Sequence, residues 1–136
     1  MANKKTERKI VIQVGKEKGE ITLAWENAPN MCKTIWDNLP LQATGTHAKV
    51  VSHELMFMLP IVMERENMQD VTPGIVGWWG NRSCVNIWYD TLGKLGPAGQ
   101  TAVIGWVTKN LEGIARESKK TWIKPGMAVK LEKDTD

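Results

Sequence analysis

The sequence is poor in cysteine and has no long apolar run, and these absences exclude several classes of protein. Its 136 residues include two cysteines, Cys32 and Cys84, and no metal-binding or redox spacing relates them, so neither a disulfide framework nor a zinc site is expected. No stretch approaches the ~18 consecutive apolar residues of a transmembrane helix. The opening residues, MANKKTERK, lack the apolar segment of a secretory signal. We therefore expect a cytoplasmic protein with no membrane partner.

A strong charge of either sign is also absent. The net charge is +3, with 42% hydrophobic and 24% charged residues, which is the composition of a folded globular domain. Four cationic residues gather near the N-terminus, Lys4, Lys5, Arg8 and Lys9. No nucleic-acid-binding motif accompanies them, so no nucleic-acid partner is expected.

The aromatic residues are distributed unevenly, with seven Trp against one Phe and one Tyr. An indole is large and carries an N–H that needs a partner, which favours pocket walls and interfaces. In the pair Trp78-Trp79, a strand would turn one ring inward and the other outward. Trp88 and Arg82 belong to the same predicted hairpin. An outward ring is stabilised by a ligand or a partner, so this hairpin predicts an aromatic wall for a planar ligand.

Alternation with a period of two predicts most of the chain as short strands. The expected strands lie near residues 9–14, 20–25, 46–51, 54–59, 75–79, 84–89, 101–107, 122–123 and 127–131. One helix is expected over 29–39, with Asn27 as its N-cap and an inward stripe that includes Ile35, and a second follows Asn110. We predict a mostly β fold, a closed antiparallel barrel with two short helices at its ends. One domain, 9–131, would lie between flexible tails, 1–8 and 132–136.

The order of several short motifs resembles a family of small bacterial proteins with a cyclophilin-like fold and no described function. The matching positions are Cys32, Trp36, His47, Glu54, Glu66-Asn67 and Pro73-Gly74, spread in order over roughly residues 9–131. The chain departs from that family at Asp37, Lys49, His53 and Ile75, where Glu, Arg, Gly and Asp are usual. The resemblance implies the closed barrel with helical plugs and little about chemistry.

Prolyl isomerase activity is excluded. Cyclophilins with that activity carry a Phe-His-Arg stretch and a Phe-Met-x-Gln-Gly-Gly-Asp loop, whereas the only Phe here is Phe57, in ELMFML. A shared scaffold does not imply a shared reaction.

The candidate catalytic residues are His47, Glu54 and Glu66. His47 and Lys49 share one face of a predicted strand, and a tight hairpin would bring Glu54 alongside, so that a neutral imidazole and a carboxylate divide the acid and base roles. A surface ion pair between Lys49 and Glu54 is the alternative. The neighbouring carboxylate and amide of Glu66-Asn67 suit recognition of a ligand amide or the capping of a turn. Two histidines offer too few ligands for a metal site, so no metal or cofactor is expected.

These observations predict a small-molecule-binding barrel, and they leave open whether it also acts on a planar cyclic amide or carboxylate by His/Glu acid–base chemistry. The expected ligand-binding residues are Trp36, Lys49, His53, Met58, Asn67, Trp78, Trp79, Arg82 and Trp88. Two alternatives stay open: a non-catalytic subunit or partner of a larger amidohydrolase, and a structural homo-oligomer with Trp-anchored interfaces.

Overall fold

The structure is a computed structural model, which describes residues 8–48, 53–90 and 99–134. Lys49 and most of the predicted tail residues lie outside these ranges. At the other end of the chain, the last strand continues to Lys133, two residues past the predicted domain boundary.

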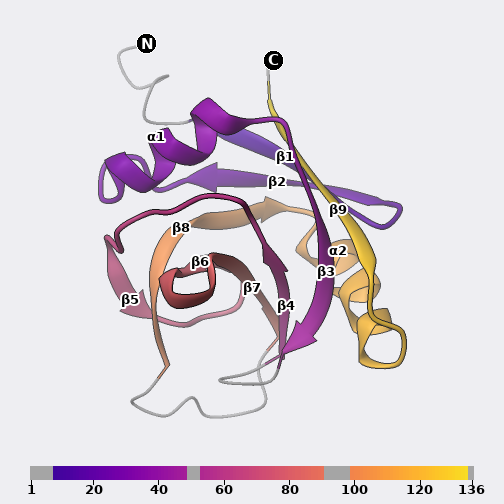
Figure 1. Ribbon diagram of the computed structural model, residues 1–136. Coiled ribbons are helices and arrows are strands. Elements are labelled where there is room, and N and C mark those ends of the chain that lie inside the picture. Colours follow the sequence, from indigo (N-terminus) through magenta and orange to yellow (C-terminus); the bar gives the residue numbers. More distant parts are fainter. Residues whose placement is uncertain (1–7, 49–52, 91–98, 135–136) are drawn as a thin grey trace.

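Nine strands in the described ranges form one sheet. They are β1 (Lys9–Val14), β2 (Glu17–Leu23), β3 (Leu41–Ala48), β4 (His53–Met58), β5 (Met68–Asp70), β6 (Ile75–Trp79), β7 (Cys84–Asp90), β8 (Gln100–Lys109) and β9 (Met127–Lys133). Their order is β2-β1-β9-β3-β4-β7-β6-β8-β5, and every pairing is antiparallel. Because β8 also pairs with β2, eight strands close into a barrel, and β5 lies outside it against β8 (Figure 1). The predicted fold class is confirmed.

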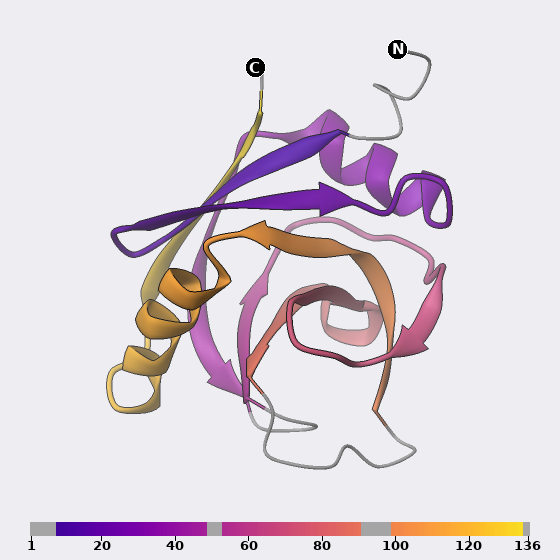
Figure 2. The same ribbon diagram turned by 180° about the vertical axis from the view of Figure 1, so that it is seen from behind.

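Two α-helices and two short 3-10 turns complete the described fold. The helices are α1 (Pro29–Asn38) and α2 (Leu111–Lys119), and the turns are η2 (Gly80–Arg82) and η3 (Lys120–Trp122). α2 packs against β1, β2, β3 and β7, strands from both sides of the barrel, and so covers one of its open ends (Figure 2). No helix in the described ranges is long and apolar enough to cross a bilayer.

The barrel interior is filled by the inward face of each strand. On β4 this face carries Leu55 and Phe57, which pair with Ile87 and Val85 of β7, and all four are buried in the main core. Ile35 of α1 is buried in the same core. Burial of apolar side chains at about 25 cal/mol per Å² is the main source of stability in such a core.

Three local predictions differ from the structure. Residues 122–123 are not a strand, because the chain tightens into η3 directly after α2 and the Thr121 hydroxyl donates to the Ser118 carbonyl. β3 begins at Leu41, where pairing with Leu131 of β9 extends it beyond the predicted strand. The N-cap of α1 is Ala28, not Asn27, and Ala28 makes no side-chain cap hydrogen bond.

Replacing Ile35 with Ala tests the packing of α1 on the barrel. The side chain is 2% exposed, so Ile35→Ala should lower the free energy of unfolding by about 2–5 kcal/mol. Urea unfolding followed by circular dichroism measures this loss. The matched control is Ile123→Ala at a side chain that is 93% exposed, where the same substitution should change stability by less than about 0.5 kcal/mol. Equal losses at the two positions would contradict the proposed packing.

Candidate functional site

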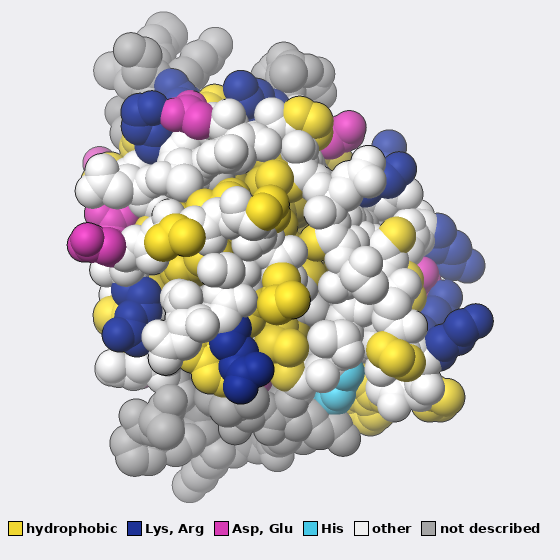
Figure 3. All heavy atoms as spheres, in the orientation of Figure 1, with side chains coloured by type: hydrophobic (Ala, Val, Ile, Leu, Met, Phe, Trp, Pro, Cys, Tyr) yellow, Lys and Arg dark blue, Asp and Glu magenta, His cyan; other side chains and the backbone are white. Residues whose placement is uncertain are grey.

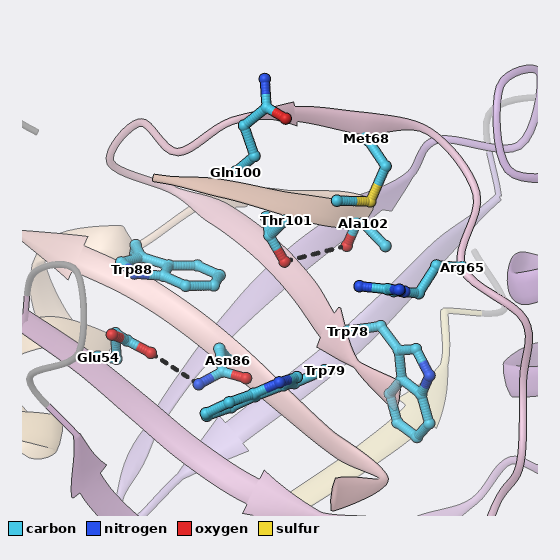
Figure 4. Close-up of a pocket in the computed structure, with 10 residues that line it drawn as sticks. All are labelled: Glu54, Arg65, Met68, Trp78, Trp79, Asn86, Trp88, Gln100, Thr101 and Ala102. Carbon is cyan, nitrogen blue, oxygen red and sulfur yellow. Dashed lines mark hydrogen bonds between the residues drawn. The ribbon is translucent and has the colours of Figure 1, made fainter. Parts of the chain in front are cut away.

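A pocket of about 220 Å³ lies on the outer face of the sheet formed by β4, β7, β6 and β8 (Figure 4). Alternate residues of a strand face opposite sides of a sheet. The residues that flank the core positions on β4 and β7 therefore point away from the barrel interior. The lining residues are Glu54, Arg65, Met68, Trp78, Trp79, Asn86, Trp88, Gln100, Thr101 and Ala102.

A buried polar pair forms one side of the pocket. Glu54 and Asn86 are each 1% exposed, and Asn86 Nδ2 donates to Glu54 Oε1 at 2.7 Å. Glu54 pairs with Trp88 in the β4–β7 ladder, so Asn86, two residues earlier on β7, is its diagonal neighbour. The Cys84 thiol donates to Asn86 Oδ1 at 3.6 Å. A buried carboxyl group costs stability unless it is hydrogen-bonded, and the Asn86 amide supplies one such bond to Glu54.

Aromatic rings form the walls. Trp78 is 1% exposed and belongs to the main core, whereas Trp79 is half-buried and borders the pocket. The Trp88 ring lies over Gly77, where a Cβ atom would come within 2.7 Å of Trp88 Cζ3 and 2.4 Å of Thr101 Oγ1. The absence of a side chain at Gly77 therefore makes room for the Trp88 ring.

One cationic side chain, Arg65, lines the pocket, and a second, Arg82, does not line it but contacts the Trp79 ring. Arg65 reaches it from the irregular segment between β4 and β5, and its guanidinium points toward the aromatic residues (Figure 4). The guanidinium carbon of Arg82 lies 5.7 Å from the centre of the Trp79 ring. In the space-filling view, hydrophobic side chains gather at the centre of one face with cationic side chains beside them (Figure 3). This combination suits a planar ligand with a negative charge.

Glu66 does not reach the pocket. Its Oε1 accepts from the backbone N–H groups of Asn30 at 3.0 Å and Met31 at 2.8 Å, and its Oε2 accepts from Asn30 Nδ2 at 2.9 Å. The two backbone N–H groups belong to the first turn of α1. The N–H groups of a first turn have no hydrogen-bond acceptor inside the helix. The carboxylate also lies at the positive end of the helix dipole. Glu66 thus takes the capping role that sequence reasoning assigned to Asn27.

Asn67 is likewise held by local bonds. It has a positive φ of 55°, its Nδ2 donates to the Val103 carbonyl at 3.1 Å, and its Oδ1 accepts from Gln69 Nε2 at 2.7 Å. Asparagine tolerates this left-handed conformation better than most residues. These bonds fix the chain between β4 and β5, the segment that carries Arg65.

The structure does not bring His47 to Glu54. His47 pairs with Leu55, a core residue, and Glu54 pairs with Ala48, so the two side chains point to opposite faces of the sheet. His47 lies against Trp122, with ring centres 5.0 Å apart, and His53 packs on the same indole at 4.7 Å. The prediction that His47 and Glu54 form a pair is wrong, because the register of the β3–β4 hairpin turns the two side chains to opposite faces of the sheet.

Two other expected ligand-binding residues, Trp36 and Met58, lie away from the pocket. Trp36 packs edge-on against Trp25, with the Arg8 guanidinium 4.5 Å from the Trp25 ring. Met58 is 67% exposed and does not line the pocket. Lys49 lies outside the described residues.

The cysteines have the chemistry of buried thiols. Burial, with a smaller contribution from the nearby Glu66 charge, raises the pKa of the Cys32 thiol to about 12. Burial also raises the pKa of Cys84, against the opposing effect of Arg82. Both thiols therefore stay protonated near neutral pH, which argues against a nucleophilic role. Within the described ranges, no group of three His, Cys, Asp or Glu residues could hold a metal ion.

Sequence reasoning singled out Glu54 and the Trp residues that line the pocket, but not the lining residues Asn86, Arg65 and Thr101. Asn86 carried a usable signal, because it is a lone amide in the otherwise apolar stretch CVNIW. Arg65 carried none, since only the path of the irregular segment after β4 brings it to the pocket.

Comparison with known proteins identifies the family. The family model described as cyclophilin-like matches residues 8–124, so the chain belongs to that family. No curated protein matches the chain.

Two solved structures share the fold. One is the solution structure of the hypothetical protein AF2241 from Archaeoglobus fulgidus, with 23% identity, a TM-score of 0.68, and coverage of 95% of this chain and 96% of that one. The other is a structure of McbB in complex with tryptophan, with 18% identity and a TM-score of 0.74. The match covers 93% of this chain and 45% of McbB. At such identities the likeness shows the fold alone.

The capping role of Glu66 predicts a loss of stability without it. Glu66→Ala removes three hydrogen bonds at the start of α1 and should lower the free energy of unfolding by about 1–2 kcal/mol. Urea titration measures the change. Glu64→Ala, at an exposed carboxylate two residues earlier, is the control and should have little effect. Unchanged stability in Glu66→Ala would overturn the capping role.

Proposed function

We propose that this protein binds a small planar molecule that carries a ring N–H and an acidic group, such as a cyclic amide carboxylate. The observation that carries the proposal is the buried carboxyl group of Glu54 beside two Trp rings in one pocket. In this arrangement the ligand ring stacks on Trp79 and Trp88, and Glu54 accepts the hydrogen bond of the ring N–H. Arg65 attracts the acidic group at the other side.

The size of the pocket supports a ligand with one ring or a compact fused pair. Its volume of about 220 Å³ leaves room for several groups the size of a water molecule. Stacking between aromatic rings is favourable beyond the area it buries. The guanidinium of Arg65 presents several N–H donors in one plane, which suits a carboxylate.

The likeness to McbB is consistent with this ligand class. McbB has been solved in complex with tryptophan, which has a planar indole ring with an N–H group and carries a carboxylate. We therefore include tryptophan among the probes for this chain.

Acid–base chemistry on such a ligand would run through Glu54. Its carboxyl group is the only Asp, Glu or His side chain among the described residues that line the pocket. Asn86 orients it, since the amide N–H donates to Oε1. His47, on the other face of the sheet, takes no part in this proposal.

Calorimetric titration tests the proposal with three probes: orotate, a planar cyclic amide with a carboxylate; uracil, the same ring without it; and L-tryptophan. We expect orotate to bind more tightly than uracil, and Arg65→Ala to remove that preference. Trp79→Ala should weaken orotate binding about threefold to tenfold through lost stacking. Glu54→Gln should weaken it further.

The matched control is Trp106→Ala, which removes an indole that is 36% exposed and does not line the pocket. It should leave orotate affinity unchanged. The proposal fails if wild-type protein binds none of the three probes at millimolar concentration, or if Trp79→Ala and Trp106→Ala have equal effects.

The burial of the Trp residues limits which of them could anchor an interface in the alternative of a structural oligomer. Trp78 and Trp88 are 1% and 5% exposed, so outside the pocket neither ring offers a contact surface to a protein partner. Trp79 is half-buried at the pocket. An oligomer that depends on this hairpin would therefore rest on Trp79 alone, and size-exclusion chromatography of the Trp79→Ala variant tests it.

A further inference from the structure

The β4–β7 ladder has an irregularity directly beside the pocket. His53 pairs with Asp90, whereas the next residue, Glu54, pairs with Trp88. β7 therefore has one residue more than β4 at this point, and the extra residue is Tyr89. A bulge of this kind redirects the side chains around it and is frequent beside functional sites.

We propose that the hydrogen bond between Trp122 and Tyr89, on the inner side of the sheet, holds this bulge and thereby positions Glu54 in the pocket on the outer side. Tyr89 and Trp122 are then positioning residues that act through β7. The role extends the proposed function, and its effect on ligand affinity rests on that function.

An aromatic cluster surrounds the bulge on the inner side. Trp122 Nε1 donates to the Tyr89 hydroxyl at 2.7 Å. The His53 ring stacks on Tyr89, with ring centres 6.2 Å apart and an interplanar angle of 21°, and its centre lies 4.7 Å from that of Trp122. His53 Nδ1 also lies 3.3 Å from Asp90 Oδ2. Side-chain contacts thus hold His53 and Asp90, which pair at the irregularity, and Tyr89, the extra residue of β7.

The pocket begins on the other side of the same residues. Glu54 and Trp88 are the first regular pair after the bulge, and both line the pocket. Asn86, two residues before Trp88 on β7, donates a hydrogen bond to Glu54. Neither Tyr89 nor Trp122 lines the pocket. A substitution at Tyr89 or Trp122 can therefore reach the ligand only through the backbone that the bulge holds.

Two substitutions remove the same hydrogen bond from opposite ends while keeping an aromatic ring: Tyr89→Phe and Trp122→Phe. Trp122 is 44% exposed, so its replacement by Phe is compatible with folding. The control is Ser118→Ala, which removes a buried hydrogen bond to the Ile114 carbonyl in α2. Each variant is made in the full chain.

The first measurement needs no ligand. The side-chain amide signals of Asn86 in ¹⁵N-labelled protein report its bond to Glu54, and Glu54→Gln defines how they move when that bond changes. We expect Tyr89→Phe and Trp122→Phe to move these signals in the same direction, and Ser118→Ala to leave them in place. Unmoved Asn86 signals in both folded aromatic variants would overturn the inference, whatever the ligand of the pocket.

The second measurement is orotate affinity in a double-mutant cycle. Tyr89→Phe should weaken binding roughly threefold to tenfold, as expected for the loss of one hydrogen bond. In a Glu54→Gln background the same substitution should have no further effect, because its action passes through Glu54. An equal loss in both backgrounds would refute the positioning role. If wild-type protein binds none of orotate, uracil and L-tryptophan, the proposed function fails, and the Asn86 signals alone decide the inference.

Discussion

The antiparallel pairing of β4 with β7 is the interaction on which both the core and the candidate site depend. One face of this ladder supplies core residues such as Leu55 and Ile87, and the other supplies Glu54 and Trp88 of the pocket. A shift of register by one residue would exchange the two faces, so that the core residues would turn outward and the pocket residues would turn into the core. The stability of the core therefore also specifies the position of the pocket residues.

Three side chains buried beside this ladder, Cys84, Asn86 and Glu54, are joined by hydrogen bonds. The Cys84 thiol donates to the Asn86 amide oxygen, and the amide nitrogen donates to Glu54. Because burial raises the pKa of Cys84, the thiol keeps the proton that it donates. A partly satisfied network would cost more than an apolar one, so the three residues are best understood as a unit.

The two candidate acids of the sequence have different roles for a simple geometric reason. Glu54 occupies a strand position that faces the pocket, where its carboxyl group meets aromatic walls. Glu66 lies in the irregular segment after β4, which passes the start of α1. Its carboxylate accepts three N–H hydrogen bonds there. Residue type alone does not distinguish a carboxylate that caps a helix from one that lines a pocket. The path of the chain around the barrel does.

The sequence by itself determined the fold class and the inward or outward direction of most strand residues, because alternation is a local property that any sheet must respect. It could also mark Glu54 and the Trp78-Trp79 pair as notable. Only the tertiary structure decided which of them meet. The hairpin register put His47 and Glu54 on opposite faces, and the approach of the irregular segment brought Arg65 to the pocket. Such contacts join residues far apart in the chain, and local periodicity carries no information about them.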